Sequence, residues 1–388
     1  MYLWFAIAFV RPVLVDIGLW FLLVRPLRLS RPWRAACVAV LLADAAKEPI
    51  LRLVGGSWFM PDIPAPLYAA LHLLRGFTTL LFVGHLAWWL LRLPVLLVRR
   101  IAGRPAATFP LRRAAAVLSA AAAILVLASF ATAILPPRVE VLDVPVEGLS
   151  PALDGYRILH LSDIHADPMA GAWRTRAIVR RANAAAPDLV CLTGDYADGA
   201  PARFAPALAP LAGLRAPDGL YACTGNHEWY PPALSPDWSA IYASLGMEML
   251  DGRTAAIPRG AARILVSGMD DEQSGATLPS RLATSGFSAA PPLPGDYRIF
   301  LKHRPTQLAP LEEAPVHLIL SGHTHAGQFP PLDLVVSAFN EGHLSGLYPL
   351  SPTTTLHVSP GASQWNGLPF RLFHRPALTV LVLRPARS

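Results

Sequence analysis

Two histidines lie one residue apart in SGHTHAGQ, residues 321–328, directly after the apolar run VHLIL at 316–320. Glycine, threonine and histidine all suit turns, so one interpretation is a polar turn with no further role. The other is a metal site, because the imidazole nitrogen of histidine is a common metal ligand. Ligand-type side chains at the ends of other strands would favour the metal site.

The elements that would position these histidines are short apolar runs separated by turn-rich or helical segments, a pattern that predicts an α/β domain after Pro137. We expect strands at 156–163, 188–195, 219–226, 263–270, 297–303, 316–323, 354–360 and 377–383, and helices at 172–186 and 236–246. The stretches 199–217 and 284–295, rich in Ala, Pro and Gly, are expected to be solvated connections.

Five of the expected strands end in polar residues of types that bind metals. In chain order these are Asp163 and His165, then Asp195, then Asn226 and His227, then His303, then His323 and His325. Active sites in such sheets gather at the carboxyl ends of strands, so we expect these side chains to share one edge. Each signal alone is weak, since Asn226, for example, also suits a helix cap. Together they favour a site for Mn, Fe, Zn or a Mg-like ion, because the donors are nitrogen and oxygen without thiolate.

The order of these motifs resembles that of the calcineurin-like metallophosphoesterases, whose signature is DxH, GDxxD, GNH[DE], a lone His and GHxH. The matching segments are SDIH (162–165), GDYAD (194–198), GNHE (225–228), LKHRP (301–305) and GHTH (322–325). The resemblance covers about residues 138–388 and is greatest for membrane-attached bacterial phosphoesterases with GHTHGGQ, with further fragments at GMDD (268–271), GLY (346–348) and GLPFRL (367–372). Two departures are Ala326, where that group usually has Gly, and Pro360, where it usually has Arg.

The resemblance implies a fold of two mixed sheets flanked by helices, and a centre of two divalent metal ions of unidentified element. The implied ligands are Asp163, His165 and His325 for one ion, Asn226, His303 and His323 for the other, and Asp195 as a bridge. Two ions about 3.5 to 4 Å apart can activate a shared water and clamp phosphoryl oxygens. His227 is implied as the catalytic group that protonates the leaving oxygen or stabilises charge on phosphorus. Asp198 and Glu228 are candidates to orient ligand histidines, with helix capping as the alternative.

The first third of the chain is apolar and basic. The whole sequence is 53% hydrophobic and 15% charged, which is too apolar for an ordinary soluble enzyme. One membrane span needs roughly 20 apolar residues. This part of the chain has four apolar stretches of about that length or more, at about 1–24, 35–54, 66–98 and 114–135. We therefore predict an all-α transmembrane region of about four spans at 1–135, followed by a metallophosphoesterase domain at 136–388.

The charges differ between these two parts. Residues 1–135 hold 14 Lys+Arg against 4 Asp+Glu, whereas residues 136–388 hold 19 against 22. A nucleic-acid partner is not expected, because the positive charge lies outside the domain that would touch phosphate. In the second stretch Asp44 and Lys47 are spaced to pair on one helix face. The third stretch is so long that its helix would tilt, kink near Pro94 or begin at the interface.

Arginines predict the orientation in the membrane. They cluster in the loops 25–34 and 99–113 and are absent from 55–65. By the positive-inside rule the two basic loops are cytoplasmic. We therefore expect a multi-pass protein of the cell (inner) membrane whose domain at 136–388 lies outside the cytoplasm, with the lipid bilayer as its partner.

These observations predict a hydrolase that cleaves a phosphate mono- or diester with a metal-activated water while tethered to the outer face of the membrane. A lipid-linked phosphoester is one candidate substrate, because about 20 residues separate the last span from the first ligand-bearing strand, and part of them, VEVLDVP, also suits a strand. One alternative is a catalytically inactive scaffold that binds a partner, against which the complete ligand set argues. Another is an exported nuclease, disfavoured by the net charge of −3 in 136–388.

Three cysteines are too few for a disulfide framework. Cys191 and Cys223 each lie in an apolar strand and are interpreted as small core residues, with a disulfide between them as the alternative.

Overall fold

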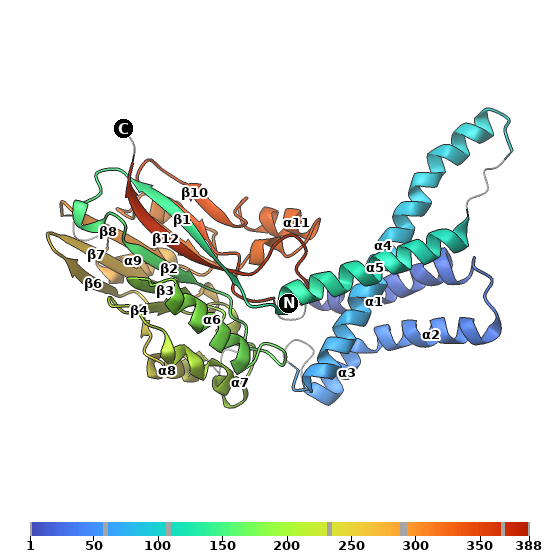
Figure 1. Cartoon of the computed structure of the whole chain (residues 1–388), viewed down its shortest axis with the longest axis horizontal. Coiled ribbons are helices and arrows are strands. Elements are labelled where there is room, and N and C mark those ends of the chain that lie inside the picture. The colour runs from blue at the N-terminus through green and yellow to red at the C-terminus, as the bar shows by residue number, and fades with distance from the viewer. Residues whose placement is uncertain are drawn as a thin grey trace. The chain divides into compact units, whose positions relative to one another are not determined.

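The structure, a computed structural model, describes residues 2–56, 61–105, 110–230, 235–287, 293–365 and 369–386. The chain divides into two compact units, Met1–Ala131 and Thr132–Ser388. Figure 1 shows the helices of the first and the sheets of the second. The predicted domain limit at 135/136 falls between the last helix of the N-terminal part and the first strand, and stays a prediction.

The N-terminal part is helical. Its elements are α1 (Tyr2–Leu19), the π-helical turn η1 (Trp20–Val24), α2 (Arg31–Ala45), α3 (Lys47–Gly55), α4 (Ala65–Ile101) and α5 (Leu111–Ile134). Among the described residues, α4 and α5 are long and apolar enough to cross a membrane. Pro94 lies inside α4, which remains one helix. The number of spans, expected to be about four, stays a prediction.

The second apolar stretch, expected as one span, is divided into α2 and α3 (Figure 1). The break lies at Ala46. Pro49 has no N–H to donate to the carbonyl four residues before it, so the helical hydrogen-bond ladder is interrupted here.

The expected pair between Asp44 and Lys47 is wrong, because both residues contact other partners. Arg75 of α4 donates from Nε to Asp44 Oδ1 at 2.8 Å and from Nη2 to Glu48 Oε2 at 3.0 Å. Lys47 Nζ lies 3.4 Å from Glu48 Oε1. The buried charges of the stretch are thus paired across three helices, which lowers the cost of holding them in an apolar region.

The second unit contains two six-stranded sheets. Their strand orders are β1-β12-β2-β3-β4-β5 and β10-β11-β9-β8-β7-β6. The strands are β1 (Arg138–Val146), β2 (Arg157–Leu161), β3 (Leu189–Thr193), β4 (Leu220–Cys223), β5 (Glu248–Met249), β6 (Thr254–Arg259), β7 (Ala262–Gly268), β8 (Asp296–Leu301), β9 (Leu318–Ser321), β10 (Gly346–Pro349), β11 (Thr355–Val358) and β12 (Ala377–Pro385). Both sheets are mixed: β2, β3 and β4 are parallel and β12 is antiparallel to β2, while β7, β8 and β9 are parallel and β6 is antiparallel to β7.

Helices cover the sheets (Figure 1). They are α6 (Ala172–Ala184), α7 (Pro201–Leu208), α8 (Ser235–Ser244), α9 (Leu278–Ser285), α10 (Ala309–Glu312) and α11 (Leu332–Phe339), with the short 3-10 turns η2 (Pro151–Leu153), η3 (Ala209–Gly213), η4 (His227–Trp229), η6 (Glu272–Ser274) and η7 (His325–Gly327). One apolar core lies between the sheets, a second joins the first sheet to α6, α7 and α8, and a third joins the other sheet to α9 and α10. The predicted α/β class, with two sheets flanked by helices, is confirmed.

All eight expected strands are present, but those that carry the polar motifs end earlier than expected. β2 stops two residues before Asp163 and β3 two residues before Asp195, because both aspartates have a left-handed backbone, with φ of 56° and 55°, that a strand does not accommodate. The segment VEVLDVP lies in β1. Strands β5, β6 and β10 were not expected.

The stretch 199–217 is not a solvated connection, because it contains α7 and η3. Phe204, Leu208 and Leu211 of this stretch are buried in the core beneath them. Of the other expected connection, 284–295, residues 288–292 lie outside the described part of the chain. Cys191 and Cys223 are free thiols buried between the sheets, so the disulfide alternative is excluded.

Candidate metal centre

The polar residues expected to gather do come together, just past the carboxyl ends of strands from both sheets. Asp163 and His165 follow β2, Asp195 follows β3, Asn226 and His227 follow β4, His303 follows β8, and His323 and His325 follow β9. All are buried except His323, which is half-buried.

Three overlapping groups of side chains have the spacing of metal ligands, with one donor atom from each residue lying within 4.8 Å of the others. These groups are Asp163, His165 and His325; His165, Asp195 and His227; and Asp195, His303 and His323. His165 Nε2 lies 3.0 Å from His325 Nε2, and Asp195 Oδ2 lies 3.2 Å from His303 Nε2. Because His165 and Asp195 each belong to two groups, the three form one continuous cluster.

Two buried atoms in this cluster have no hydrogen-bond partner among the described residues. They are the amide oxygen Oδ1 of Asn226 and the ring nitrogen Nε2 of His303, of which Nε2 has the Asp195 carboxylate 3.2 Å away as an ionic partner. A buried polar atom without a partner costs about 1 to 3 kcal/mol, and a cation bound between such atoms would remove that cost. The residues therefore fit a site for divalent ions with nitrogen and oxygen ligands.

The backbone at these positions is strained. Five of the seven predicted ligands have a positive φ: Asp163 at 56°, His165 at 43°, Asp195 at 55°, His323 at 72° and His325 at 50°. Non-glycine residues rarely adopt this conformation, and such strain is concentrated at functional sites.

Two motif glycines allow the close approach of the carboxylates. A Cβ atom on Gly225 would lie 2.2 Å from Asp195 Oδ1, and one on Gly322 would lie 2.4 Å from Asp163 Oδ2. These distances are too short for any larger residue, so the glycines of the GNHE and GHTH motifs are required for packing around the carboxylates.

The charges of the cluster suit cation binding. Burial alone would raise the pKa of Asp195, but His303 and His227 hold that pKa well below its usual range. Burial would lower the pKa of His303, but the Asp195 carboxylate raises it to about 9. For His323, burial and the neighbouring His303 lower the pKa to about 3. A charged Asp195 and a neutral His323 are ready to bind a cation, whereas His303 would release a proton on binding.

Asp198 and Glu228, the two candidates for orienting the histidines, have different contacts. Asp198 Oδ1 lies 2.9 Å from His165 Nδ1 and also contacts His227 Nδ1, so it fixes both rings. Glu228 instead accepts the hydroxyl of Tyr242 at 3.0 Å. It accepts the backbone N–H groups of Asp195 at 3.0 Å, Tyr196 at 2.8 Å and Gly225 at 2.7 Å, and thereby holds the turn that carries Asp195.

A family profile described as calcineurin-like phosphoesterase matches residues 156–327, which include all seven predicted ligands. The chain contains a calcineurin-like phosphoesterase domain. Proteins of this family generally use a dinuclear metal centre.

Relatives share this domain. The chain is 36% identical over 265 residues to a Bos taurus "Transmembrane protein with metallophosphoesterase domain", with 65% of this chain and 58% of that protein covered. A Danio rerio protein with the same name is 33% identical over 275 residues, with 68% and 61% covered. A Helicobacter pylori "Uncharacterized metallophosphoesterase" is 31% identical over 235 residues, with 59% and 60% covered. The chain therefore spans about 60% of the length of each relative. Membership of the membrane-attached bacterial subgroup stays a prediction.

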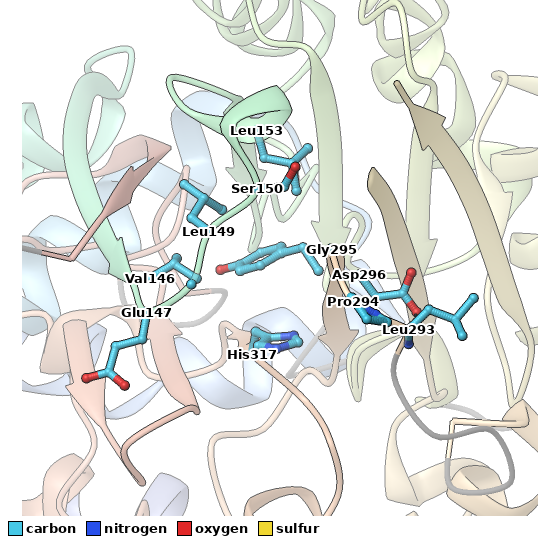
Figure 2. Close-up of a pocket in the computed structure, with 12 residues that line it drawn as sticks. Val146, Glu147, Leu149, Ser150, Leu153, Leu293, Pro294, Gly295, Asp296 and His317 are labelled. Atoms are coloured by element: carbon cyan, nitrogen blue, oxygen red, sulfur yellow. The ribbon is translucent and has the colours of Figure 1, made fainter. Parts of the chain in front are cut away.

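A separate pocket of about 290 Å³ lies in the same unit as the phosphoesterase domain (Figure 2). Its lining includes Asp296 and Tyr297 at the start of β8, and His317 just before β9. His303 and His323 follow the other ends of these two strands. The pocket contains none of the predicted site residues and lies at the opposite strand ends from the candidate metal centre.

Arg371 was not singled out from the sequence as a site residue, although it lies in the fragment GLPFRL. It is fully buried, and Nη1 donates to the carbonyls of His325 at 3.0 Å and Pro360 at 2.7 Å. Its Nη2 lies 3.0 Å from His325 Nδ1 and also donates to the carbonyl of Ser363. Arg371 thus fixes both the backbone and the ring of a predicted ligand.

The fragment GMDD also meets the site. Arg304, the residue after His303, donates from Nε to Asp271 Oδ2 at 2.7 Å and from Nη2 to Asp271 Oδ1 at 3.1 Å. This two-point ion pair joins the segment after β7 to the segment after β8, and so helps to fix the backbone that carries His303.

We expect Arg371→Ala to weaken binding at the His325 side of the centre, because loss of such a supporting contact typically costs about 10 to 100-fold in metal affinity. Titration of the metal-free, full-length protein with Mn²⁺ or Zn²⁺ would measure this. Arg298→Ala is the matched control, since Arg298 is equally buried and donates to the Phe287 carbonyl at 2.9 Å. Equal affinities in the two variants would show that Arg371 only stabilises the fold.

Proposed function

We propose that this chain is a membrane-tethered, metal-dependent hydrolase of phosphate mono- or diesters. The observation that carries the proposal is the buried cluster of three ligand groups joined through His165 and Asp195. The family match over residues 156–327 supports it.

We assign the predicted ligands as follows: Asp163, His165 and His325 to one ion, Asn226, His303 and His323 to the other, and Asp195 to both. This division is supported by the first and third ligand groups, which hold Asp163, His165 and His325 and hold Asp195, His303 and His323, and by the Asn226 oxygen without a hydrogen bond. When bound, two divalent ions would supply an activated water and neutralise charge on the phosphoryl oxygens. The nitrogen and oxygen donors suit Mn, Fe, Zn or similar ions.

We assign His227 as the group that gives a proton to the leaving oxygen or stabilises charge on phosphorus. Its Nδ1 contacts the Asp198 carboxylate, and its Nε2 lies 3.9 Å from Asp195 Oδ2 at the centre of the cluster. A buried carboxylate behind the imidazole is an arrangement that holds a catalytic histidine in one orientation.

Asp195→Asn should abolish hydrolysis of an aryl phosphate ester and reduce the metal content below two equivalents, because one carboxylate is assigned to both ions. Activity assays and elemental analysis of the purified variant would measure the two effects. Asp218→Asn, a change to a carboxylate outside the cluster, is the control. If the wild-type protein binds two ions but hydrolyses no phosphoester, the inactive scaffold becomes the better explanation.

His227→Ala should keep both metal ions and lose activity by on the order of 10² to 10⁴-fold, the usual contribution of proton transfer. The loss should be smaller for substrates with very acidic leaving groups, because these need no proton. Rates measured over a series of aryl phosphates test this role. An equal loss across the series would count against proton donation by His227.

We further propose that the protein crosses the cell (inner) membrane more than once and carries its catalytic domain outside the cytoplasm. Support comes from the arginines of the segment 99–113 on the chain before α5, and from the apolar helices α4 and α5.

A reporter active only in the periplasm should therefore be active when fused after residue 388, and a reporter active only in the cytoplasm should be silent there. Fusion at residue 104, in the arginine-rich segment, should give the opposite pattern. The reverse result at both positions would invert the proposed topology.

We also propose a lipid-linked phosphoester as substrate. The support is the short connection between α5, which ends at Ile134, and the phosphoesterase domain, which begins with β1 at Arg138. A domain held so close to a span meets lipid headgroups at high local concentration.

The full-length protein in detergent–lipid micelles should therefore hydrolyse a lipid phosphoester faster than its water-soluble headgroup analogue. Asp195→Asn serves as the control for contaminating activity. A clear preference for the soluble analogue would reject the lipid substrate while leaving phosphoester hydrolysis intact.

A further inference from the structure

The exposed face of α11 has an unusual composition for a helix of a folded domain. Leu334 is 71% exposed, Val335 49% and Phe339 78%, and Ala338 is exposed between them. The polar residue Ser337 lies instead on the half-buried side. The half-buried side also holds the apolar residues Leu332 and Val336, so α11 is apolar on both sides, whereas an ordinary surface helix has a polar exposed face.

Helix α6 in the same unit shows the ordinary arrangement. Its exposed face includes Arg176, Arg180 and Arg181, while Ile178 and Val179 are buried. The difference is thus a property of α11 and not of the whole unit.

Phe373 extends the apolar surface of α11. The residues on either side of it contact α11 and the segment before it: His374 Nε2 lies 3.7 Å from Asp333 Oδ2 in the helix, and Leu372 donates its N–H to the carbonyl of Gln328, four residues before the helix, at 3.0 Å. Phe373 itself is 80% exposed and has a φ of 71°. An aromatic residue held outward in a left-handed conformation stores backbone strain, which is typical of a functional position.

We propose that these residues, Leu334, Val335, Ala338, Phe339 and Phe373, form a lipid-docking face that inserts into the bilayer surface. Isolated exposed apolar residues are common, but a contiguous apolar group marks an interaction site. The occupant follows from the chain itself, because only residues 135–137 separate α5, a helix apolar enough to span a membrane, from β1 of the same unit. A bilayer crossed by α5 would therefore be close to this unit at all times. Partial insertion of an apolar face into a bilayer surface is favourable.

The lipid-docking face is close in sequence to residues of the candidate metal centre. Helix α11 begins seven residues after His325, and Arg371, which contacts His325, lies two residues before Phe373. Docking would therefore bring the centre to the level of lipid headgroups. This inference concerns contact with lipid and does not depend on hydrolysis.

Lipid quenching of a fluorophore tests the proposal on the full-length protein. Phe339→Cys, made together with Cys37→Ser to remove the one native thiol that is not buried, would be labelled with bimane and reconstituted into phosphatidylcholine vesicles. Vesicles containing lipid brominated on its acyl chains should quench the label several-fold more than they quench the same label at Arg180→Cys on α6. Quenching no greater at residue 339 than at residue 180 would overturn the proposal.

A second labelled position tests whether the whole face inserts into the bilayer or only the label at residue 339 does. With bimane at Phe373→Cys, the double change Leu334→Asp and Phe339→Asp should reduce quenching by brominated lipid, because charges on the same face oppose insertion. Unchanged quenching at 373 would overturn the proposal that the residues act as one face. The unlabelled Phe339→Cys variant tests the other occupant. If it forms a disulfide between residues 339 of two copies, and the labelled variant shows no quenching by lipid, the proposal is overturned and the face is assigned to a second copy of the chain.

Discussion

Burial of the Asp195 carboxylate is the constraint on which the second unit depends. A carboxylate removed from water must be surrounded by groups that stabilise its charge. Its surroundings come from two directions: His165 and His227 from the first sheet, and His303 from the second. The two sheets must therefore stack with the relevant carboxyl ends on the same side. The apolar core between them, which is built from both sheets, maintains that alignment.

The helical part also buries carboxylates, but it stabilises their charge with an arginine in place of histidines. Asp44 and Glu48 are buried in an apolar region, and Arg75, 31 and 27 residues further along the chain, pairs with both. With Lys47, which lies 3.4 Å from Glu48 Oε1, the two carboxylates are balanced by two cations, whereas Asn226 Oδ1 and His303 Nε2 of the phosphoesterase domain have no hydrogen bond among the described residues. The first arrangement joins helices; the second retains free ligand atoms, as a binding site requires.

The sequence alone was sufficient for the strands that carry the polar residues and for the gathering of those residues, because both follow from local patterns. Apolar runs of strand length ending in Asp, Asn or His are visible without a structure. The helix α7 was also visible in principle, since Phe204, Leu208 and Leu211 have helical spacing, but its Ala and Pro content suggested a connection. Contacts between distant segments could not be found in this way. Local spacing suggested Lys47 as the ion-pair partner of Asp44, whereas the partner is Arg75, in another helix. The role of Arg371 could not be found because it depends on the chain returning to the vicinity of His325.

The order of strands in the first sheet affects how the protein can be made. Among the described strands, β1 pairs only with β12, in parallel, and β12 in turn separates β1 from β2. During synthesis the segment nearest α5 must therefore wait for some 230 further residues before its neighbour exists. Until then both β1 and β2 have an unpaired edge, which is prone to association with other chains, and long-range pairing of this kind slows folding. The first sheet thus closes last at β1, the strand that follows α5 in the sequence, and removal of β12 would separate β1 from β2.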